Sequence, residues 1–332
     1  MAKASKNNPR ITGSTAKKLL LLAVGALTLI SAAALAQILN PCATMPLDSG
    51  AAEISSDLYA NPQLVAIDGY DGDSMEPFIT GEGNYLLFNN LNSALVDTHI
   101  HLCKRVGTNS FQHLGLLSGS VSKSKDMAPS IDADGHLYFT SLRSFDKDGH
   151  SIYVGNFEKE TLKSAELPNG DISPHLPATI NMDCDVSKDG KTLVLSRAHF
   201  VNPLLPPAQS DLILATKQAG VFSVDPNKQN VLSNINTQAL EYAPCLSADQ
   251  LELYFTRASL HKKADGKAGQ PYLRIMVAKR ENKDLPFGKP AVLKELTGFI
   301  EAPTITNDKH ELFFHKKVGD KFRIFCAKRN KI

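Results

Sequence analysis

Five stretches of the chain repeat one pattern of hydrophobic and polar positions. Each opens near an acidic or small residue, usually followed by proline, and continues as a short alternation of apolar and polar side chains. A polar turn such as Asp134-Gly135 comes next, and a run rich in Leu, Tyr and Phe follows it. This order predicts a β-hairpin in every copy. The copies begin at Met75, Met127, Met182, Glu241 and Glu301.

Equivalent positions in the five copies lie roughly fifty to sixty residues apart, which leaves room for four strands in each copy. An aliphatic third strand follows each hairpin, and a fourth strand follows in the first four copies. The sequence therefore predicts an all-β fold, a five-bladed β-propeller of four-stranded antiparallel blades. We expect the blades at about residues 71–117, 118–169, 170–236, 237–296 and 297–332.

The last of these blades runs out of chain after its third strand. An open sheet edge invites pairing with other chains, and a ring of blades needs to be closed to be stable. A spare strand, PQLVAID at residues 62–68, lies just before the first blade. We expect this N-terminal strand to close the ring as the outer strand of the last blade, so that the propeller spans residues 62–332.

The chain begins with basic residues that precede an apolar run over residues 19–36. The basic flank, the apolar centre and the ending Ala34-Leu35-Ala36 predict a signal peptide over residues 1–36. A single membrane anchor helix at residues 19–36 is the alternative, because the run approaches the length that spans a bilayer. Both predict export, with the propeller periplasmic, secreted or anchored outside the cytoplasm. Residues 37–61 are expected to form a flexible linker.

The charge balance and the motifs exclude several classes of function. The formal net charge is +2, and no basic cluster is interleaved with aromatic residues, so we expect no nucleic-acid partner. No Gly-rich phosphate loop or Gly-x-Ser-x-Gly motif occurs, and we expect no cofactor. His99 and His101 alternate on one strand near Asp97, a pattern more typical of a half-exposed strand than of a metal site. We expect a monomer.

Charged residues gather at one predicted rim of the propeller. The first strand of each blade lines the axis, so the acids at the starts of these strands are expected to meet there. They are Glu76, Asp126, Asp183, Glu241 and Glu301. Basic residues at the ends of the second strands surround them, His315 among them. The candidate ligand-binding residues of this rim are Arg143, Arg197, His199, Phe200, Arg257 and His261.

Two interpretations of the acids remain open. In the first, each acid pairs with an arginine or with turn amides, because a buried charge needs a partner. In the second, two of the carboxylates act on a glycosidic bond, one as acid and the other as base or nucleophile. The chain has no Trp, which argues against a sugar site built on aromatic stacking. The loop at residues 198–210 is expected to expose Phe200 to a partner; a loop packed over its own blade is the alternative.

The cysteines of an exported chain meet an oxidising compartment. Cys184 and Cys245 fall on neighbouring first strands in slots that differ by one residue, so they point to opposite faces. Opposite faces of adjacent blades meet at an interface, which makes this pair the candidate disulfide. Free, buried thiols are the alternative.

Two of the copies, MAPSIDADGHLYFTSLR and EYAPCLSADQLELYFTR, resemble the repeat of TolB-like, WD-like β-propellers. The likeness covers the chain from about residue 68 to its end, and it implies a propeller that serves as a protein-binding platform or envelope component. We therefore expect an exported, non-enzymatic binding module that presents one rim to a protein or to an envelope glycan. The alternative is a carbohydrate-active enzyme, a glycosidase-like five-bladed propeller that uses the rim carboxylates.

Overall fold

Strands make up almost all the regular structure in the computed structural model, which describes residues 45–50, 52–92, 96–201 and 206–331. Within these ranges there are two short helices, α3 (Phe145–Asp148) and the 3-10 helix η1 (Pro226–Leu232). The prediction of an all-β chain is confirmed. Neither helix is long and apolar enough to cross a bilayer. The predicted signal peptide or anchor at residues 1–36 lies outside the described residues.

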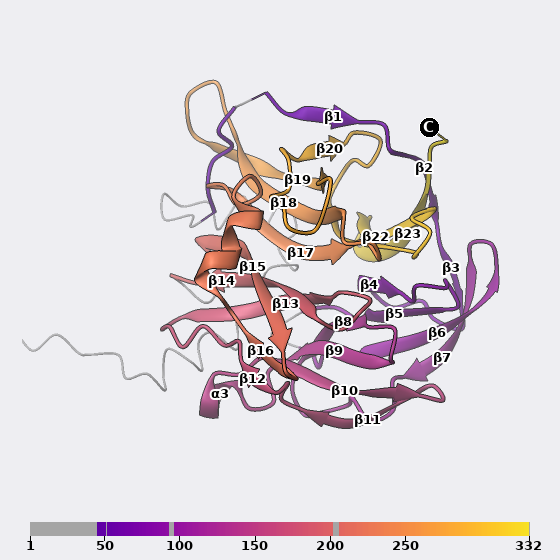
Figure 1. Ribbon diagram of the computed structural model, residues 1–332. Helices are drawn as coiled ribbons and strands as arrows, with labels where there is room; N and C mark the ends of the chain where they lie inside the picture. The colour runs from indigo at the N-terminus through magenta and orange to yellow at the C-terminus, as the bar shows by residue number, and fades with distance from the viewer. Residues whose placement is uncertain (1–44, 51, 93–95, 202–205, 332) are drawn as a thin grey trace, which may run out of the picture.

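The strands form five hairpin units that follow one another along the chain (Figure 1). Unit one has the order β3 (Ala66–Asp68), β7 (Ser110–Leu116), β6 (Ile100–Gly107), β5 (Tyr85–Asn89), β4 (Met75–Ile79). Unit two has the order β11 (Thr161–Glu166), β10 (Ile152–Glu158), β9 (His136–Ser141), β8 (Asp126–Ile131). Unit three has the order β12 (Gly170–Asp171), β16 (Val221–Ser223), β15 (Gln209–Gln218), β14 (Thr192–His199), β13 (Thr179–Val186).

Units four and five repeat this plan with strands borrowed from the N-terminal part of the chain. Unit four has the order β1 (Ile54–Ser56), β20 (Ala291–Leu293), β19 (Ala268–Lys279), β18 (Glu252–Lys262), β17 (Leu240–Leu246). Unit five has the order β2 (Tyr59–Leu64), β23 (Lys321–Arg329), β22 (Glu311–Val318), β21 (Ile300–Ile305). A single bridge between Ser210 and Leu240 merges units three and four into one ten-stranded sheet.

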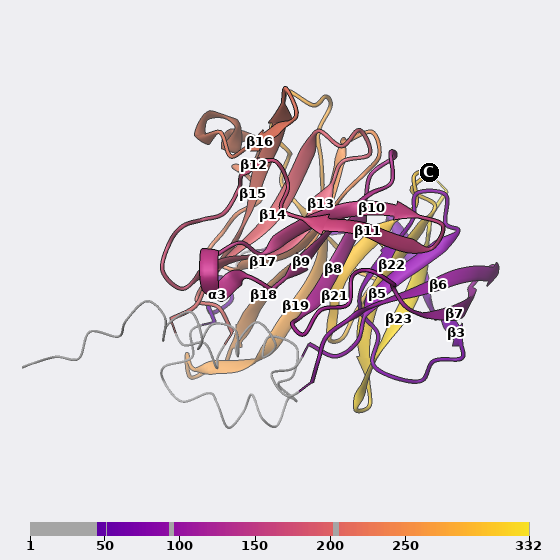
Figure 2. The same cartoon turned by 90° about the horizontal axis from the view of Figure 1, so that it is seen from below.

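The first strands of the five units contact one another in a circuit. β4 contacts β8, β8 contacts β13, β13 contacts β17, β17 contacts β21, and β21 contacts β4 again. In Figure 1 these strands lie toward the middle of the molecule, and β1, β2, β3 and β11 lie at its edge. In the view from below, α3 and the tip of the β18–β19 hairpin lie at the same side of the molecule (Figure 2), and Phe145 and Leu273 share one buried cluster.

A buried apolar cluster fills each seam between neighbouring units. Between units one and two, for example, Phe78 and Leu87 pack with Phe139 and Tyr153. The seam between units five and one is built in the same way, because Phe313 and Ile324 pack in one cluster with side chains from β5, β6 and β7. Burial of large apolar side chains at every seam is the main source of stability that this arrangement offers.

A side chain at the equivalent position of each second strand also makes a hydrogen bond across its seam. Four of these side chains accept from a backbone N–H of the next first strand, and the fifth, Thr140, donates to the carbonyl of Met182 over 2.7 Å. The four accepting pairs are Asn89 with Ala128 at 3.1 Å, Ser196 with Ala243 at 3.0 Å, Thr256 with Ala302 at 3.0 Å, and His315 with Glu76 at 3.1 Å. The circuit of contacts is thus also a circuit of hydrogen bonds.

The N-terminal strand that was expected to pair with the last strand does so, with different bounds. β2 pairs antiparallel with β23, and Tyr59 lies opposite Arg329. The residues predicted for this role, 62–68, are divided, because Ala66–Asp68 form β3 and pair with β7 of unit one. Tyr59 sets the bounds: it is fully buried in the seam between units four and five, and its hydroxyl donates to the Lys309 carbonyl over 2.6 Å.

The segment expected as a flexible linker makes defined contacts from residue 45 onward. The amide of Leu260 donates to the carbonyl of Pro46 over 2.8 Å, and Ile54–Ser56 form β1, which pairs with β20. Glu53 also forms a 2.9 Å ion pair with Arg274, whose side chain is only 3% exposed. Residues 45–56 therefore add an edge strand to unit four, which composition alone could not indicate.

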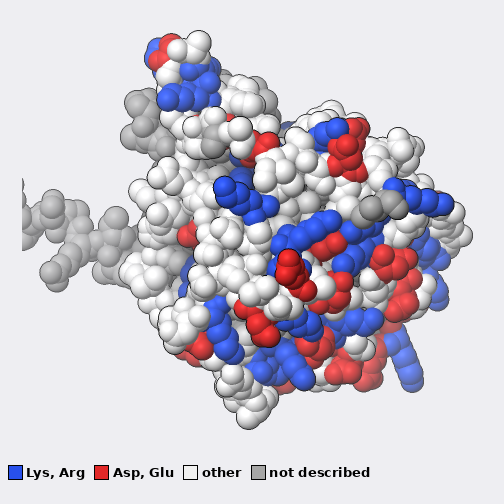
Figure 3. All heavy atoms as spheres, turned by 45° about the horizontal axis from the view of Figure 1, so that its top comes forward, with Lys and Arg blue, Asp and Glu red and all other residues white. Residues whose placement is uncertain are grey.

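Charges of both signs are interspersed over the face shown in Figure 3.

Candidate functional site

Three of the predicted rim acids line one small cavity on the axis. Glu76 comes from β4, Asp183 from β13 and Glu301 from β21. The cavity has a volume of about 30 Å³, and its other lining residues are Asn92, Met127, Met182, Tyr242, Ala243, Ala302 and His315. Side chains from all five units thus meet at one point, and the carboxylates come from three of them.

Alignment of the five hairpins shows that these acids depart from the repeat. The slot of Glu301 holds Met75, Met127, Met182 and Tyr242 in the other units, and the next slot holds Glu76, Ala128, Asp183, Ala243 and Ala302. A structural requirement of the repeat would recur in every unit. The acids instead replace Met, Tyr or Ala in single units, and all three replacements face the same cavity.

The backbone at this level of the axis is strained in a regular way. Glu76, Ala128, Ala243 and Ala302 all have positive φ angles, from 47° to 55°. Each lies at a break in the pairing register of its hairpin, which marks a β-bulge. A non-glycine residue costs energy in this region and is held there by its surroundings. The bulges turn the chain so that the side chain of Glu76 and the amides of the alanines face the neighbouring units.

Glu76 is a half-buried residue whose carboxyl group has one buried, unsatisfied oxygen. Its Oε1 accepts a 2.6 Å hydrogen bond from Asn92 Nδ2, and its Oε2 is buried without a hydrogen-bond partner. Burial raises the pKa of Glu76 well above its ordinary value, and the carboxylates of Asp183 and Glu301 raise it further. Burial and these like charges therefore favour the protonated form of Glu76.

Asp183 and Glu301 are better supplied with donors. Asp183 Oδ2 accepts from the Ala243 amide over 3.1 Å, and burial raises the pKa of Asp183 to about 6. Glu301 Oε1 accepts from the Tyr242 hydroxyl, and its Oε2 lies 3.0 Å from His315 Nε2. Burial, followed by the Glu301 carboxylate, raises the pKa of Tyr242 well above its ordinary value, so this hydroxyl remains a donor. Each oxygen of Glu301 thus has a hydrogen-bonding partner.

The other two predicted acids have structural surroundings instead. Asp126 Oδ1 accepts from Arg143 over 2.9 Å, and its Oδ2 accepts from the hydroxyl and amide of Ser122. Glu241 Oε1 accepts from Arg257 over 2.7 Å, and its Oε2 accepts from the Thr237 amide. Both carboxylates are fully buried, and every oxygen has a partner. The structural interpretation fits these two acids, and the second interpretation fits Glu76, Asp183 and Glu301.

The candidate ligand-binding arginines serve the same structural pairs. Arg143 and Arg257 bind their acids, and Arg197 Nε donates to Asn181 Oδ1 over 3.1 Å in the corresponding position of unit three. His199 Nδ1 lies 3.1 Å from the Thr179 hydroxyl, and His261 stacks on Tyr272 with ring centroids 4.4 Å apart. None of these five residues is among those that line the carboxylate cavity.

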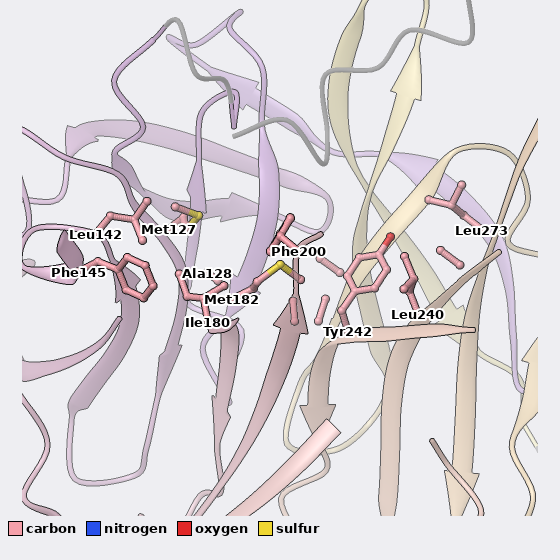
Figure 4. Close-up of a cluster of buried hydrophobic side chains, with 14 residues drawn as sticks. Met127, Ala128, Leu142, Phe145, Ile180, Met182, Phe200, Leu240, Tyr242 and Leu273 are labelled. Atoms are coloured by element: carbon pink, nitrogen blue, oxygen red, sulfur yellow. The ribbon is translucent and has the colours of Figure 1, made fainter. Parts of the chain in front are cut away.

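The expectation that Phe200 is exposed is wrong. Phe200 is only 2% exposed and packs with Met182 and Ile180 in one buried apolar cluster (Figure 4). It follows directly on β14, and its amide donates to the Ala178 carbonyl over 2.8 Å, which turns its ring inward. The neighbouring loop positions, residues 202–205, lie outside the described residues.

The candidate disulfide between Cys184 and Cys245 is also wrong. Both thiols are free and buried. Cys184 packs with Tyr138 and Leu195 in the seam between units two and three, and Cys245 packs with Tyr254 in the seam between units four and five. The two side chains therefore point into different seams. Burial raises the pKa of both thiols well above its ordinary value, which keeps them unreactive.

Several residues of the cavity are not among the predicted site residues. Tyr242 and Asn92 were not predicted as site residues, and His315 was placed on the rim without a role. Asp185 lies two residues after Asp183 on β13, and burial raises its pKa to about 7. Superposition of the five copies would have identified Tyr242 and His315 as departures from Met and from Thr, Ser or Asn. In the part of the chain that is described, no three potential ligands form a metal site.

Comparisons with known proteins concern the fold. No protein-family model matches the chain, and no curated protein matches it. A solved family 117 glycoside hydrolase from the marine bacterium Zobellia galactanivorans is similar over 82% of this chain and 92% of its own, with a TM-score of 0.50 and 13% identity. The GH62 α-L-arabinofuranosidase domain of Coprinopsis cinerea is similar over 83% and 98%, with a TM-score of 0.49 and 8% identity.

These findings correct the family and the function expected from the repeats. The solved structure that is similar at a TM-score of 0.50 is a glycoside hydrolase, and not a TolB-like or WD-like binding repeat. The prediction of that repeat family is therefore wrong. The prediction of a non-enzymatic module for a protein or envelope ligand is wrong as well. At 13% identity the likeness establishes the fold alone, which is an all-β fold shared with propeller glycoside hydrolases.

Proposed function

We propose that the chain is a glycoside hydrolase, a five-bladed propeller closed by β2, whose reaction uses Glu76, Asp183 and Glu301. The observation that carries this proposal is the convergence of these three carboxylates in one cavity, each in a slot where other units have Met, Tyr or Ala. The circuit of contacts from β4 through β21 and back supports the five blades and their closure. Hydrolysis of a glycosidic bond needs two carboxyl groups in different protonation states.

Glu76 fits the role of general acid, because burial and two neighbouring carboxylates keep it protonated. In this role it gives its proton to the glycosidic oxygen as the bond from that oxygen to the anomeric carbon breaks. A water molecule supplies the new hydroxyl group, and its proton goes to a carboxylate. Glu301 fits this second role, because Tyr242 and His315 bind it as an acceptor. Asp183 lies beside both and adjusts the charge of the site.

A sugar ring can enter only if side chains above the acids move. A cavity of about 30 Å³ has the volume of about one water molecule. Met127 and Met182 line its apolar side and are linked to the cluster around Phe200. Methionine is the most adaptable of the large apolar residues, so displacement of these two side chains requires little reorganisation of the backbone. Tyr242 is then the aromatic residue available to a sugar.

The substrate is proposed to lie outside the cytoplasm. The basic and apolar start of the sequence predicts a signal peptide or an anchor at residues 1–36. A glycan of the cell envelope or of the extracellular medium is the class of substrate that an exported hydrolase of this kind meets.

The proposal is tested by hydrolysis assays on a panel of 4-nitrophenyl glycosides, pyranosides and furanosides in both anomeric forms. We expect Glu76→Gln and Glu301→Gln to lower kcat by roughly 10²- to 10⁴-fold with the fold intact. The matched controls are Asp126→Asn and Glu241→Gln, which are expected to lower the melting temperature and to leave the rate per folded molecule unchanged. Absence of hydrolysis across the panel, or equal rate losses in all four variants, would overturn the proposal.

A further inference from the structure

His315 occupies a repeated position with an unusual side chain. The corresponding residues at the other seams are Asn89, Thr140, Ser196 and Thr256, all small polar groups that bind the backbone of the next unit. His315 makes the same contact, because its Nδ1 accepts from the Glu76 amide over 3.1 Å. A Thr would satisfy that contact. The imidazole adds a second ring nitrogen, which reaches Glu301 at 3.0 Å.

The two contacts together fix the tautomer of the ring. Nδ1 is the acceptor of a backbone N–H, so it carries no hydrogen. The hydrogen of the neutral imidazole must then lie on Nε2, which donates it to Glu301 Oε2. The side chain is 1% exposed and has Phe322 against it, edge to face, at 5.4 Å between centroids. The ring is therefore held in one orientation.

We propose that His315 is a positioning residue that assigns different roles to the two glutamates. It donates to Glu301, which makes Glu301 the proton acceptor of the pair, and it binds the backbone of Glu76 at the seam between the last and first units. The inference rests on the proposed function, since the roles it assigns are those of base and acid.

The groups around the ring agree with this assignment. Glu301 from β21, Glu76 from β4, Asp183 from β13 and Tyr242 from β17 are the titratable groups that line the cavity with it. Tyr242 donates to the other oxygen of Glu301, so that carboxylate has a donor on each oxygen. Glu76 Oε1 receives the side-chain amide of Asn92, and its Oε2 has no hydrogen-bond partner. The side-chain donors of the cavity are thus directed mainly at Glu301.

Two substitutions separate the positioning role from the structural one. His315→Thr restores the side chain that unit four uses at its seam, so it retains the acceptor for the Glu76 amide and loses the donor to Glu301. His315→Asn retains an acceptor and a donor, as Asn89 does in unit one, where it also donates to Asn92 over 2.9 Å. We expect both variants to melt within a few degrees of the wild type, because both preserve the seam.

The kinetic test uses the glycoside that the wild type hydrolyses best. His315→Thr is expected to lower kcat roughly tenfold to a hundredfold with little change in KM, and to move the acidic limb of the pH profile to higher pH. His315→Asn is expected to recover most of that loss. Unchanged kcat and an unchanged pH profile in His315→Thr would overturn the inference.

A second measurement does not depend on activity. Nitrogen-15 NMR of the histidine side chains of the intact protein reports which ring nitrogen carries the hydrogen. We expect the Nε2–H form for His315, and a shift of that resonance in Glu301→Gln. The Nδ1–H form would overturn the inference even if the enzyme is active. If no glycoside is hydrolysed, the proposed function fails, and this spectrum still decides whether His315 orients Glu301.

Discussion

At the scale of single residues, burial on the axis changes the chemistry of each carboxylate according to its partners. Asp185 is an example outside the proposed site, because its oxygens accept from the Ser130 hydroxyl over 2.8 Å and from the Leu246 amide over 2.7 Å. It has no cation partner, and burial raises its pKa to about 7. The residue therefore links units two, three and four as a group that prefers to be protonated.

This preference predicts a pH dependence of stability. A pKa raised in the folded state means that the contribution of Asp185 is complete below the unfolded pKa and is lost as pH rises through about 7. Asp185→Asn does not titrate; its side-chain oxygen can accept from the Leu246 amide, and its NH2 group can donate to the Ser130 hydroxyl oxygen. Its melting temperature should therefore gain on the wild type between about pH 4 and pH 7. Thermal melts of both proteins across that range provide the measurement. A constant difference between them would show that Asp185 does not titrate as described.

At the scale of elements, β2 is the strand on which unit five depends. Without it, β23 would present an open edge, and the buried Tyr59 would leave its seam. The sequence predicted that an N-terminal strand pairs there, since unit five lacked a fourth strand. It did not predict the bounds of this strand. The alternating residues from Gln63 to Ile67 suit the edge of unit five and the edge of unit one, and only the burial of Tyr59 distinguishes the two.

Two substitutions on this strand are expected to differ sharply. Tyr59→Ala removes a fully buried ring and should lower the free energy of unfolding by about 3–5 kcal/mol. Leu64→Ala changes a side chain that is 55% exposed and should alter it by less than about 0.5 kcal/mol. Urea unfolding of both variants gives the comparison. Similar losses in the two variants would mean that the burial of Tyr59 does not anchor the strand.

The rim acids show where prediction from sequence stops at the level of the hairpin. Asp126 and Glu241 lie one slot before Met127 and Tyr242 and pair with Arg143 and Arg257, while Glu76 and Asp183 lie one slot after those positions. Positions two residues apart share a face on a regular strand, but the breaks in pairing register at Glu76 and Asp183 turn these side chains differently, so similar acids at similar places have different surroundings. The hairpins themselves were predictable, because their alternation and turns are local properties of the sequence.

At the scale of the whole molecule, the circuit of seams implies that the units share their stability. Thr256→Val leaves the Ala302 amide without its acceptor and should cost about 1–3 kcal/mol. In a closed ring this loss of stability is shared by every unit. The most slowly exchanging backbone amides in β5 and β14 should then lose as much protection from hydrogen exchange as those in β18. Hydrogen exchange of the intact protein measures this protection. Thr256→Ser is the control, because serine retains the hydroxyl oxygen that accepts from the Ala302 amide. Loss confined to units four and five would contradict closure.

The melting temperature of Glu76→Gln, measured beside that of Glu241→Gln at pH 8, tests the central claim without knowledge of a substrate. Burial of the carboxyl group and like charges favour the protonated form of Glu76, so Glu76→Gln should melt at the same temperature as the wild type or higher. Glu241 balances the buried Arg257, so its amide should melt several degrees lower. If both variants lose stability to the same extent, Glu76 is a structural acid like Glu241, and the proposed active site is wrong.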